Sequence, residues 1–467
     1  MIQNLPSKDA LEIVRKNMAE YGQSCAEGRA YPNLYDGLKS SYKRSIYGMH
    51  LHNNHKIVKV AELAAYALPF HPHPSSIADV IISLGDFGNK IKLLETQGNF
   101  GDSSRNIYAA SPRYIGGYLS DFAEQLMCEA VEYAPKIKGE IEKDEPEALP
   151  TFLPICFING SQGIPSGLPA LNVPTINLEE LCDYYINILS HKTLDFTPRK
   201  LPSPNLELDI ISPRSDWDNI LKVGKGTLRL APRMTIEKGV ITIYNAPSNR
   251  GVEFIQKILD KANLSEKVDI RDESTYRTLI VLEKVPKKQC NMQDVFELVY
   301  NKLQLTESYN MAFFDKDKIY VPCSFDKVVK ANLEFLIETH KNYLSHQEES
   351  LKRKLTILEI IESMKSSGQI KKLNEMSYDE AKSFISKKYK VDDEISSQVL
   401  QKPMSYLTKE HLNEIEDLKN KITDVQNSNR DIFEYLLEKY KGIKKSILSL
   451  TKNKFLPTVF VDSTKLW

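Results

Sequence analysis

Apolar residues recur at helical spacing along the first part of the chain. A first helix is expected after Ser7, a residue type that caps helix N-termini. The apolar positions of this helix are Ala10, Ile13, Val14, Met18 and Tyr21. Residues 37–52 and 58–68 continue the helical period in short stretches separated by polar residues. This pattern predicts a compact helical domain of helix-turn-helix type, a kind that often binds DNA, with a plain helical bundle as the alternative.

The middle of the chain mixes strand-like and helix-like runs. Residues 153–167 (LPICFINGSQGIPSG) join an apolar run to a glycine-rich loop, which predicts a strand entering a tight turn. The loop lacks the Gly-Lys-Ser/Thr ending of a phosphate-binding P-loop, so ATP hydrolysis by this chain is not expected. Residues 227–285 alternate apolar runs (GVITIY, RTLIVLEKV) with one helix-like stretch, which predicts an α+β domain.

Long helices dominate from Val328 onward. Apolar residues stand close to heptad or helical spacing at Leu333, Leu336, Ile337, Tyr343, Leu351, Leu355, Leu358 and Ile361. A second long helix is expected at about 412–448, and a shorter helical insert lies between the two. The pattern predicts an antiparallel coiled coil that carries a small globular tip, which would form a dimer contact. A plain helical bundle is the alternative.

Composition limits the class of protein. A chain of 467 residues is expected to form several domains, and 41% hydrophobic and 27% charged residues are typical of globular proteins. No apolar run approaches the roughly 20 residues of a membrane-spanning helix. Met1 to Pro6 lack a signal-peptide pattern, so a cytoplasmic location is expected. Lysine and arginine balance the acidic residues at 62 each, so binding to a nucleic acid would depend on local clusters of basic side chains.

Cysteines and histidines give no ligand set at the level of sequence. The six cysteines lie far apart without a CxxC pair, which favours reduced thiols over zinc or disulfides. His50, His52 and His55 are close in sequence, but no cysteine or carboxylate cluster completes a ligand set near them. We interpret them as surface or DNA-facing residues and expect no metal site in this chain. His71 and His73 flank Pro72, a pattern that also fits an ordinary helix start.

Seven segments carry a family resemblance in one consistent order. They are GRAYPNLYDGLKSSYKR (28–44), FHPHPSS (70–76), QGNFG (97–101), AASPRY (109–114), FINGSQGI (157–164), GKGTLR (224–229) and DIRDES (269–274). Together they resemble the motifs of the cleavage subunits of type IIA DNA topoisomerases, which include the gyrase A subunit, the topoisomerase IV A subunit and the phage medium subunit. The resemblance extends over roughly residues 10–448.

The resemblance implies a multidomain α+β protein. The expected parts are an N-terminal helical arm (1–25), a winged-helix DNA-binding domain with the catalytic tyrosine (26–150), an α/β tower domain (151–327), a coiled coil (328–450) with a dimerisation tip at about 373–407, and a C-terminal tail (451–467).

The resemblance also identifies Tyr114 as a nucleophile that attacks a DNA phosphodiester and forms a reversible 5′-phosphotyrosyl link. Sequence spacing alone gives Tyr114 no special status. A tyrosine hydroxyl has a pKa of about 10, so it is a weak nucleophile at neutral pH unless a neighbouring cation or base favours the phenolate. Arg113 and Arg29 would stabilise the negative charge that develops on the phosphate oxygens, and His73 would lie near the scissile phosphate.

Further residues are implied to position DNA. The resemblance places Lys39, Tyr42, Lys43 and Arg44 on a recognition helix, His71 and Ser76 in the HPH element, and Ile164 as a wedge between base pairs. Phosphate contacts orient a protein on DNA without reading sequence. The chain departs from the family where Pro74 and Ser75 replace a Gly-Asp pair. A second departure is Tyr42 and Lys43, which replace a His-Arg pair.

The resemblance also implies partners. Members of the family take their Mg²⁺ from acidic residues of a separate Toprim domain, and no matching Asp-x-Asp element near a glycine-rich strand is found here. The resemblance therefore implies that Mg²⁺ and ATP act on a separate ATPase/Toprim subunit, which would form a heterotetramer with a homodimer of this chain. About twenty residues follow the second long helix, which is too few for a DNA-wrapping domain. Relaxation or decatenation by a short phage-type form is therefore expected. The alternatives are a noncatalytic, architectural DNA-binding dimer and a supercoiling gyrase with its wrapping domain on another chain.

Overall fold

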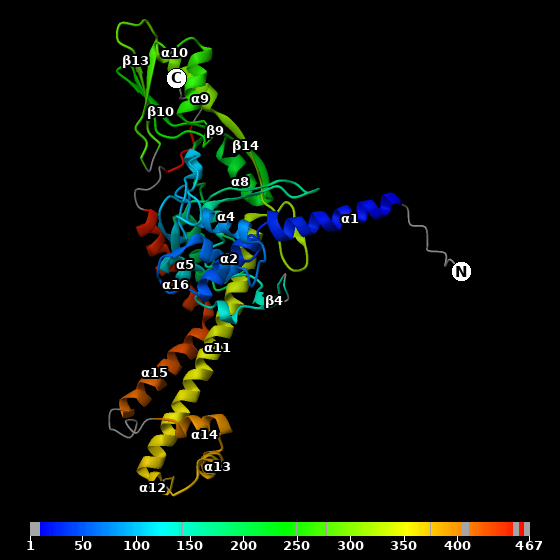
Figure 1. The fold of residues 1–467 in the computed structure, drawn as a ribbon, viewed down its shortest axis with the longest axis vertical. Helices are drawn as coiled ribbons and strands as arrows, with labels where there is room; N and C mark the ends of the chain where they lie inside the picture. Colours follow the sequence, from blue (N-terminus) through cyan, green and yellow to red (C-terminus); the bar gives the residue numbers. More distant parts are fainter. Residues whose placement is uncertain are drawn as a thin grey trace, which may run out of the picture. The chain divides into compact units, whose positions relative to one another are not determined.

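The computed structural model describes residues 10–139, 141, 143–248, 250–275, 278–373, 375–402, 411–451 and 457–461. The expected N-cap at Ser7 lies outside these residues. The chain divides into two compact units, one formed by residues 1–336 with 437–467 and the other by residues 337–436. Both helices and strands are present (Figure 1), so the expected mixed α and β architecture is confirmed. The domain boundaries expected within the first unit stay a prediction.

The first unit begins with helices and a small antiparallel sheet. Its helices are α1 (Ala10–Cys25), α2 (Ser40–Leu51), α3 (Val60–Ala67), α4 (Pro74–Leu84) and α5 (Asp121–Met127). Its strands are β1 (Val58–Lys59), β2 (Leu94–Gln97) and β3 (Gly116–Leu119), in the order β1-β3-β2. A π-helical turn (Ala26–Ala30) joins α1 to the segment before α2, and a hairpin of β4 (Lys136–Lys138) and β5 (Asp144–Pro146) follows α5. The apolar face expected on the first helix is exposed at Ile13, Val14, Met18 and Tyr21.

A five-stranded sheet organises the next part of this unit. Its strands are β6 (Ser161–Gly163), β7 (Leu171–Val173), β14 (Leu305–Asn310), β9 (Lys225–Ala231) and β8 (Asp209–Ile210), in that spatial order. The accompanying helices are α6 (Ile155–Asn159), α7 (Leu178–Ser190) and α8 (Arg214–Val223). The strand expected within residues 153–167 is wrong at its start, because the apolar run forms the short helix α6. Ile155 to Ile158 are all buried, and a short run buried on every side has no period that separates strand from helix.

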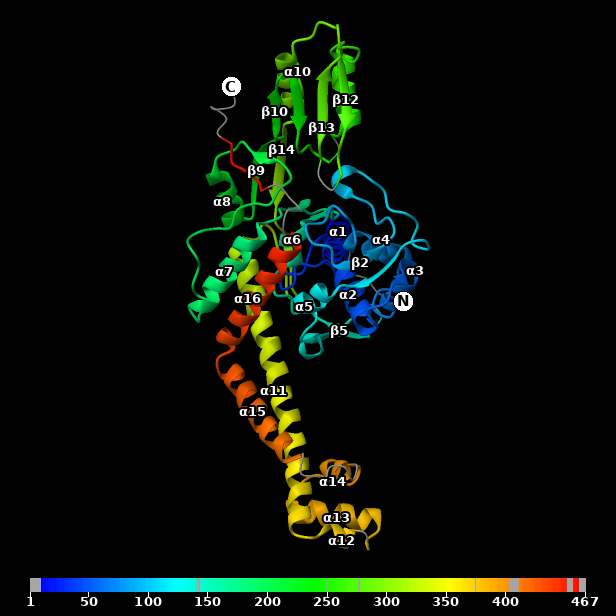
Figure 2. The ribbon, with the colours of Figure 1, turned by 90° about the vertical axis from the view of Figure 1, so that its left-hand side faces the viewer.

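A second, four-stranded antiparallel sheet has helices packed on it. Its strands are β10 (Met234–Glu237), β11 (Val240–Ile243), β13 (Ile280–Lys284) and β12 (Val268–Asp272). Helices α9 (Val252–Lys261) and α10 (Met292–Leu303) share one apolar core with this sheet. Figure 2 shows α10 beside the strands β10, β13 and β12. Ile241 and Ile243 enter that core because alternate residues of a strand point to the same face. The α+β arrangement expected for residues 227–285 is confirmed.

Long helices follow the short strands β15 (Phe313–Phe314) and β16 (Ile319–Tyr320). They are α11 (Phe325–Ser366), α15 (His411–Arg430) and α16 (Ile432–Thr451), with α12 (Ile370–Leu373), α13 (Tyr378–Tyr389) and α14 (Asp393–Leu400) between α11 and α15. In the second unit, α12 to α14 pack with the end of α11 around Ile361 and Ile385. The single second helix expected at about 412–448 is interrupted at Asp431, whose carboxylate accepts from the Glu434 amide at 3.2 Å and begins α16.

No helix in the described part of the chain combines the length and the apolar character that a membrane-spanning segment requires. The cysteines are all free thiols, as expected.

A buried carboxylate fixes the turn that leads into α2. Asp36 is fully buried and accepts from the backbone amides of Leu38 at 2.8 Å and Leu149 at 2.9 Å. The Ile155 amide donates to the Asp36 carbonyl at 3.0 Å, so three segments meet at this residue. Burial raises the pKa of Asp36 to about 7, because the ionised form is poorly solvated there. Asp36 therefore couples the geometry before α2 to the protonation state of one side chain.

The raised pKa predicts a stability loss with rising pH. The folded state binds the Asp36 proton more tightly than the unfolded state, whose aspartate pKa is about 3.9, so stability falls as pH rises from about 4 to about 7. The slope from one group is at most about 1.4 kcal/mol per pH unit. Urea unfolding at pH 5 and pH 7.5 should show this loss in the wild type and a smaller loss in Asp36→Asn.

The amide in Asp36→Asn does not titrate, so any lost hydrogen bond shifts its stability equally at both pH values. Asp79→Asn, a change at an exposed position on α4, is the matched control and should keep the wild-type pH dependence. Identical pH slopes for the wild type and Asp36→Asn would show that Asp36 is not the responsible group.

Candidate functional site

A groove of about 1160 Å³ gathers many of the residues singled out from the sequence. Its walls come from α1, the π-helical turn, α2, the start of α4 and the β4-β5 hairpin. The expected site residues that line it are Arg29, Lys43, Arg44, His71, His73 and Ser76. Lys138 and Lys316 add cations, while Glu20 and Glu27 add carboxylates. The groove is thus polar and of mixed charge, with Arg29 exposed on the π-helical turn.

The start of α4 presents polar groups to this groove. His73 is the N-cap residue, and Pro74 occupies the first turn, where its missing N–H removes no helical hydrogen bond. The Ser76 hydroxyl donates to the His73 carbonyl at 2.9 Å. His73 is exposed, whereas His71 is buried and meets the His73 ring edge-on with centroids 5.0 Å apart. Backbone amides at a helix N-terminus favour an anion, and Arg29 lines the same groove as His73 and Ser76.

Lys43 and Arg44 point into the protein and meet one carboxylate. The Lys43 ammonium donates to Glu145 at 3.2 Å and to the Pro146 carbonyl at 2.8 Å. Arg44 donates to both oxygens of Glu145, with Nε to Oε2 at 2.9 Å and Nη2 to Oε1 at 3.1 Å. The Glu145 side chain is 1% exposed, and that of Lys43 is 6% exposed. This geometry does not support the expectation that Lys43 contacts DNA, because a phosphate contact would require a buried ion pair to open.

Arg44 also links this ion pair to the groove. Its Nη1 lies 3.2 Å from Nδ1 of His71, which in turn contacts His73. Burial lowers the pKa of Lys43, while the nearby Glu145 and Asp36 carboxylates oppose that effect. Arg44 is therefore placed to hold the histidine pair in position, and we interpret its role as orientation of the groove.

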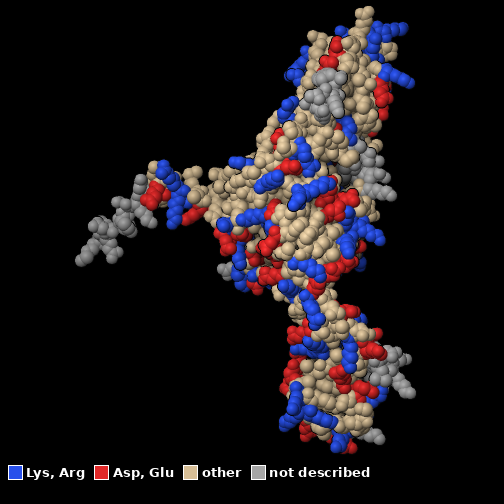
Figure 3. Space-filling view, turned by 180° about the vertical axis from the view of Figure 1, so that it is seen from behind, with Lys and Arg blue, Asp and Glu red and all other residues tan. Residues whose placement is uncertain are grey.

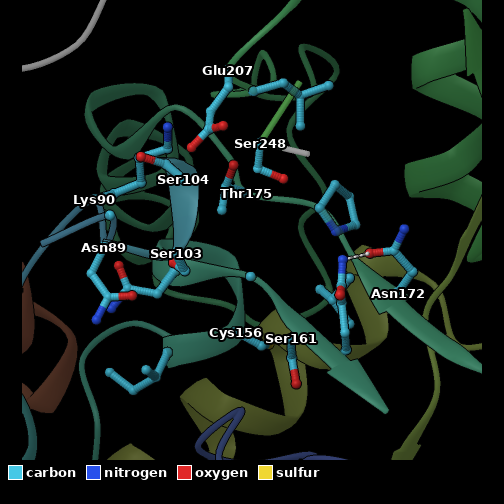
Figure 4. Close-up of a pocket in the computed structure, with 18 of the residues that line it drawn as sticks. Asn89, Lys90, Ser103, Ser104, Cys156, Ser161, Asn172, Thr175, Glu207 and Ser248 are labelled. Atoms are coloured by element: carbon cyan, nitrogen blue, oxygen red, sulfur yellow. Dashed lines mark hydrogen bonds between the residues drawn. The ribbon is translucent and has the colours of Figure 1, made fainter. Parts of the chain in front are cut away.

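Lys39 and Tyr42 line a second cavity, of about 700 Å³. Figure 4 shows other residues that line this cavity. Lys39 donates to the Gln162 carbonyl at 2.5 Å, and the Tyr42 hydroxyl accepts from Ser83 at 2.7 Å. Burial lowers the pKa of Lys39 and raises the pKa of Tyr42. Hydroxyl, amide and charged groups surround the cavity at Asn89, Lys90, Ser103, Ser104, Ser161, Asn172, Thr175, Glu207 and Ser248. Lys39 and Tyr42 thus tie α2 to neighbouring segments.

Tyr114 lies on a turn at residues 112–114, directly before strand β3. Its side chain is 65% exposed, whereas the next residue, Ile115, is 1% exposed. The Arg113 guanidinium lies 4.8 Å from the centroid of the Tyr114 ring, and Lys59 donates to the Tyr114 carbonyl at 3.1 Å. The buried Ile115 and the hydrogen bond from Lys59 to the Tyr114 carbonyl hold the backbone, while the phenol is exposed. One cation, Arg113, therefore lies beside the Tyr114 ring, whereas Lys59 contacts the backbone carbonyl of this tyrosine.

Ile164 is 90% exposed, which is unusual for an isoleucine. It follows strand β6 directly and precedes the buried Pro165. A Cβ at the preceding Gly163 would stand 2.2 Å from the Ala30 carbonyl oxygen, so only glycine permits this close approach. The approach joins the loop bearing Ile164 to the turn bearing Arg29.

The structure does not place all expected residues in one cavity. Arg113, Tyr114 and Ile164 line neither the groove nor the second cavity. Sequence reasoning missed Glu145, the common partner of Lys43 and Arg44, and Lys59, the partner of the Tyr114 backbone. Glu145 stands about a hundred residues from α2, and no local pattern signals such a pairing.

The histidines at the end of α2 and just after it have partners that their sequence neighbourhood does not reveal. The expectation that no cysteine or carboxylate stands beside His50 is wrong, because Glu124 and Cys128 lie next to it in space. His52 stacks on Tyr66 with ring centroids 4.5 Å apart. His55 pairs with Asp121 at 3.0 Å. None of these contacts could be predicted from the spacing of the histidines, because the partners belong to α3 or α5 and not to the segment that carries the histidines.

Comparison with known proteins gives one consistent result. Residues 29–447 match the sequence model of the family described as the A subunit of DNA gyrase/topoisomerase IV. The chain is 27% identical over 453 residues to the DNA gyrase A subunit of Thermotoga maritima, covering 91% of this chain and 55% of that protein. It is 28% identical over 324 residues to the DNA topoisomerase 4 A subunit of Pseudomonas aeruginosa, covering 66% and 42% of the two chains.

A third relative is the DNA topoisomerase 4 A subunit of Salmonella typhimurium, 27% identical over 369 residues, which cover 74% of this chain and 49% of that protein. The chain spans about half the length of these curated relatives. The family match extends over most of the chain, from the turn bearing Arg29 to helix α16. The chain therefore belongs to the family of the DNA gyrase/topoisomerase IV A subunits.

Proposed function

We propose that this chain is the DNA breakage-reunion subunit of a type IIA topoisomerase and that Tyr114 is its nucleophile. The observation that carries the proposal is the exposed phenol of Tyr114 on a backbone held by Ile115 and Lys59, beside the Arg113 guanidinium, in a chain of this family. A nucleophile must reach a duplex from outside, and 65% exposure meets that requirement. Among the described tyrosines, burial instead encloses Tyr31, Tyr185 and Tyr440.

The proposed reaction is an exchange of ester bonds. The Tyr114 hydroxyl loses its proton, and its oxygen attacks a phosphodiester phosphorus. The P–O bond to the 3′ oxygen breaks, a 3′-hydroxyl takes up a proton, and a 5′-phosphotyrosyl link remains. Attack by that hydroxyl reverses each step, so rejoining consumes no ATP. Arg113, beside the Tyr114 ring, would stabilise the negative charge that develops on the phosphate oxygens through its fixed positive charge.

The groove supplies the proposed backbone contacts. Arg29 and the start of α4 with His73 and Ser76 would bind phosphates of the same DNA segment. Arg44 would act indirectly, by holding His71 against His73. The groove and the Tyr114 turn are separate in a single chain, so we propose that bound DNA and a second copy of the chain complete the site.

Ile164 is proposed to wedge between base pairs. An apolar side chain exposed at 90% gains by leaving water, and insertion between base pairs provides an apolar contact. Unstacking a base step costs on the order of a few kcal/mol, which the larger contact surface of bent DNA offsets. The anchored loop is suited to this work because Gly163 packs on Ala30 and Pro165 is buried.

Mg²⁺ and ATP are proposed to act on a partner ATPase/Toprim subunit, in a heterotetramer that passes a second duplex through the break. The relatives are named as the A subunits of DNA gyrase and of DNA topoisomerase 4, and such names support an enzyme of more than one kind of subunit. Within the first unit, we propose that α2 to α4 and the sheet β1-β3-β2 form the winged-helix domain. We propose that residues 151–327 form the tower. Relaxation or decatenation is the proposed outcome.

Replacement of the nucleophile should abolish covalent capture of DNA. The wild-type chain, mixed with its partner subunit, Mg²⁺ and plasmid and then treated with detergent and protease, should yield linear DNA with blocked 5′ ends. Tyr114→Phe should yield none, because the ring keeps its packing but lacks the oxygen that bonds to phosphorus. Tyr108→Phe, an 83% exposed tyrosine on the preceding loop, is the matched control.

Breaks that persist in Tyr114→Phe would assign the nucleophile elsewhere. If wild type and variant both bind DNA but neither yields breaks with any partner subunit, the alternative of a noncatalytic architectural dimer is correct.

Truncation of the proposed wedge should reduce DNA bending and cleavage without destabilising the chain. Ile164→Ala should lower bending, measured by energy transfer between dyes at the ends of a short duplex, and should lower the yield of trapped breaks at least several-fold. Its thermal unfolding should match the wild type, because surface changes away from structural features are usually within about 0.5 kcal/mol. Val223→Ala, 43% exposed, is the control. Unchanged bending in Ile164→Ala would refute the wedge.

Loss of Arg29 should weaken the salt dependence of DNA binding. One lost phosphate contact lowers the slope of log affinity against log salt by about 0.9. Fluorescence anisotropy of a labelled duplex over a range of KCl concentrations measures this slope for Arg29→Ala. Arg199→Ala, at an exposed position after α7, should keep the wild-type slope. Equal slopes for Arg29→Ala and the wild type would remove Arg29 from the phosphate-binding set.

A further inference from the structure

Three side chains with different ligand atoms converge where α2 meets α5. His50 lies in the last turn of α2, Glu124 lies on α5, and Cys128 is the C-cap residue of α5. One nitrogen, one carboxylate oxygen and the sulfur of this trio all lie within 4.8 Å of one another. His50 Nδ1 stands 2.6 Å from Glu124 Oε2. Glu124 and Cys128 stand four residues apart, so one helical face presents both.

The chemistry of this trio favours one class of ion. We propose that His50, Glu124 and Cys128 form a binding site for a zinc-like divalent transition metal, with water as the fourth ligand. Imidazole, carboxylate and thiolate are the three ligand types of zinc, and magnesium and calcium prefer oxygen ligands alone. Ligand atoms around a tetrahedral zinc stand roughly 3.4–3.6 Å apart, given metal–ligand bonds of about 2.0–2.3 Å. Side-chain shifts of about 1 Å therefore convert the present arrangement into a coordination shell.

Metal binding exchanges protons on the ligand atoms for bonds to the metal. The metal displaces the proton between His50 Nδ1 and Glu124, and both this proton and that of the Cys128 thiol are released to solvent as the metal–ligand bonds form. No oxidant or reductant takes part.

Neighbouring groups support the site. Asn53 donates to the second carboxylate oxygen of Glu124 at 2.9 Å and to the Leu119 carbonyl at 3.0 Å, which fixes the orientation of the carboxylate. Cys128 is 4% exposed, while the side chains of His50 and Glu124 are 25% and 21% exposed. The buried sulfur thus sits beneath two ligands that reach solvent, which leaves an entry path for the ion.

The site would cross-link two elements of the first unit. Helix α2 carries Lys43 and Arg44, and α5 directly follows strand β3, which extends from the Tyr114 turn. A metal that joins the end of α2 to α5 stabilises the folded state by its binding free energy. This inference does not depend on the proposed DNA chemistry and can be tested on the chain alone.

Cobalt(II) is the probe, because it takes zinc ligands and reports thiolate bonding by a charge-transfer absorption. The full-length chain, freed of metal by a chelator and kept reduced, is titrated with Co²⁺ and then with Zn²⁺. One equivalent of Co²⁺ per chain should produce the thiolate band, Zn²⁺ should abolish it, and the thermal midpoint should rise with Zn²⁺. Absence of the band in the wild type at micromolar Co²⁺ would overturn the proposal whatever the variants do.

Variants separate the ligands from their neighbours. Cys128→Ser should remove the thiolate band, and Glu124→Gln should weaken Zn²⁺ binding. Asn53→Ala should weaken Zn²⁺ binding by about 10–100-fold, the usual effect of losing a group that orients a ligand. Cys25→Ser and His52→Gln are matched controls outside the trio and should bind as the wild type does. A band that survives Cys128→Ser, or is lost in Cys25→Ser, would place the metal elsewhere and refute this site.

Discussion

A single buried carboxylate, Glu145, holds together the surface from which the groove is built. It lies on strand β5 and binds Lys43 and Arg44 of α2 at once. Removing one partner from a buried ion pair costs about 3–5 kcal/mol, because the remaining charge is left without compensation. With two cations on one carboxylate, neither the hairpin nor α2 can move alone. Arg44 also contacts His71, and His71 contacts His73 at the N-terminus of α4, so the position of α2 influences the position of both histidines.

The long-range character of this ion pair shows where sequence reasoning ends. Helices with a clear hydrophobic period, such as α11, and the strands of residues 227–285 could be predicted. The hydrophobic period of a helix or strand depends only on residues that are close together in the sequence. The break at Asp431 and the helix at residues 155–159 could not. The first depends on a capping contact, and the second depends on burial on every side. The partner of Lys43 and Arg44 lies on a distant hairpin, so two basic residues that suggest a DNA contact serve the interior instead.

The candidate site likewise has one part that the sequence predicts and another that only the structure reveals. Tyr114, Arg113 and Ile164 were singled out by resemblance to ordered motifs, and their residue types alone carry no such information. The structure adds a physical reason why these side chains are suited to contact a ligand. The Tyr114 phenol and the Ile164 side chain are exposed, and neighbouring residues hold the backbone at both positions. Neither residue type nor exposure could predict that the Tyr114 turn lies apart from the groove, because this separation depends on how the elements that carry them pack.

Charge then determines how such a chain can bind DNA. Its basic and acidic residues balance at 62 each, and both kinds are interspersed on the face seen in Figure 3. Lys43 and Arg44 are paired with Glu145 in the interior, so these two cations are not available to replace counterions along a DNA backbone. Under the proposed function, affinity would come from contacts around Arg29 and Arg113 and from deformation of the duplex by Ile164. A protein that gains its binding energy from bending selects DNA that bends readily, and the cost of deformation rather than base contacts would set its preferred sites.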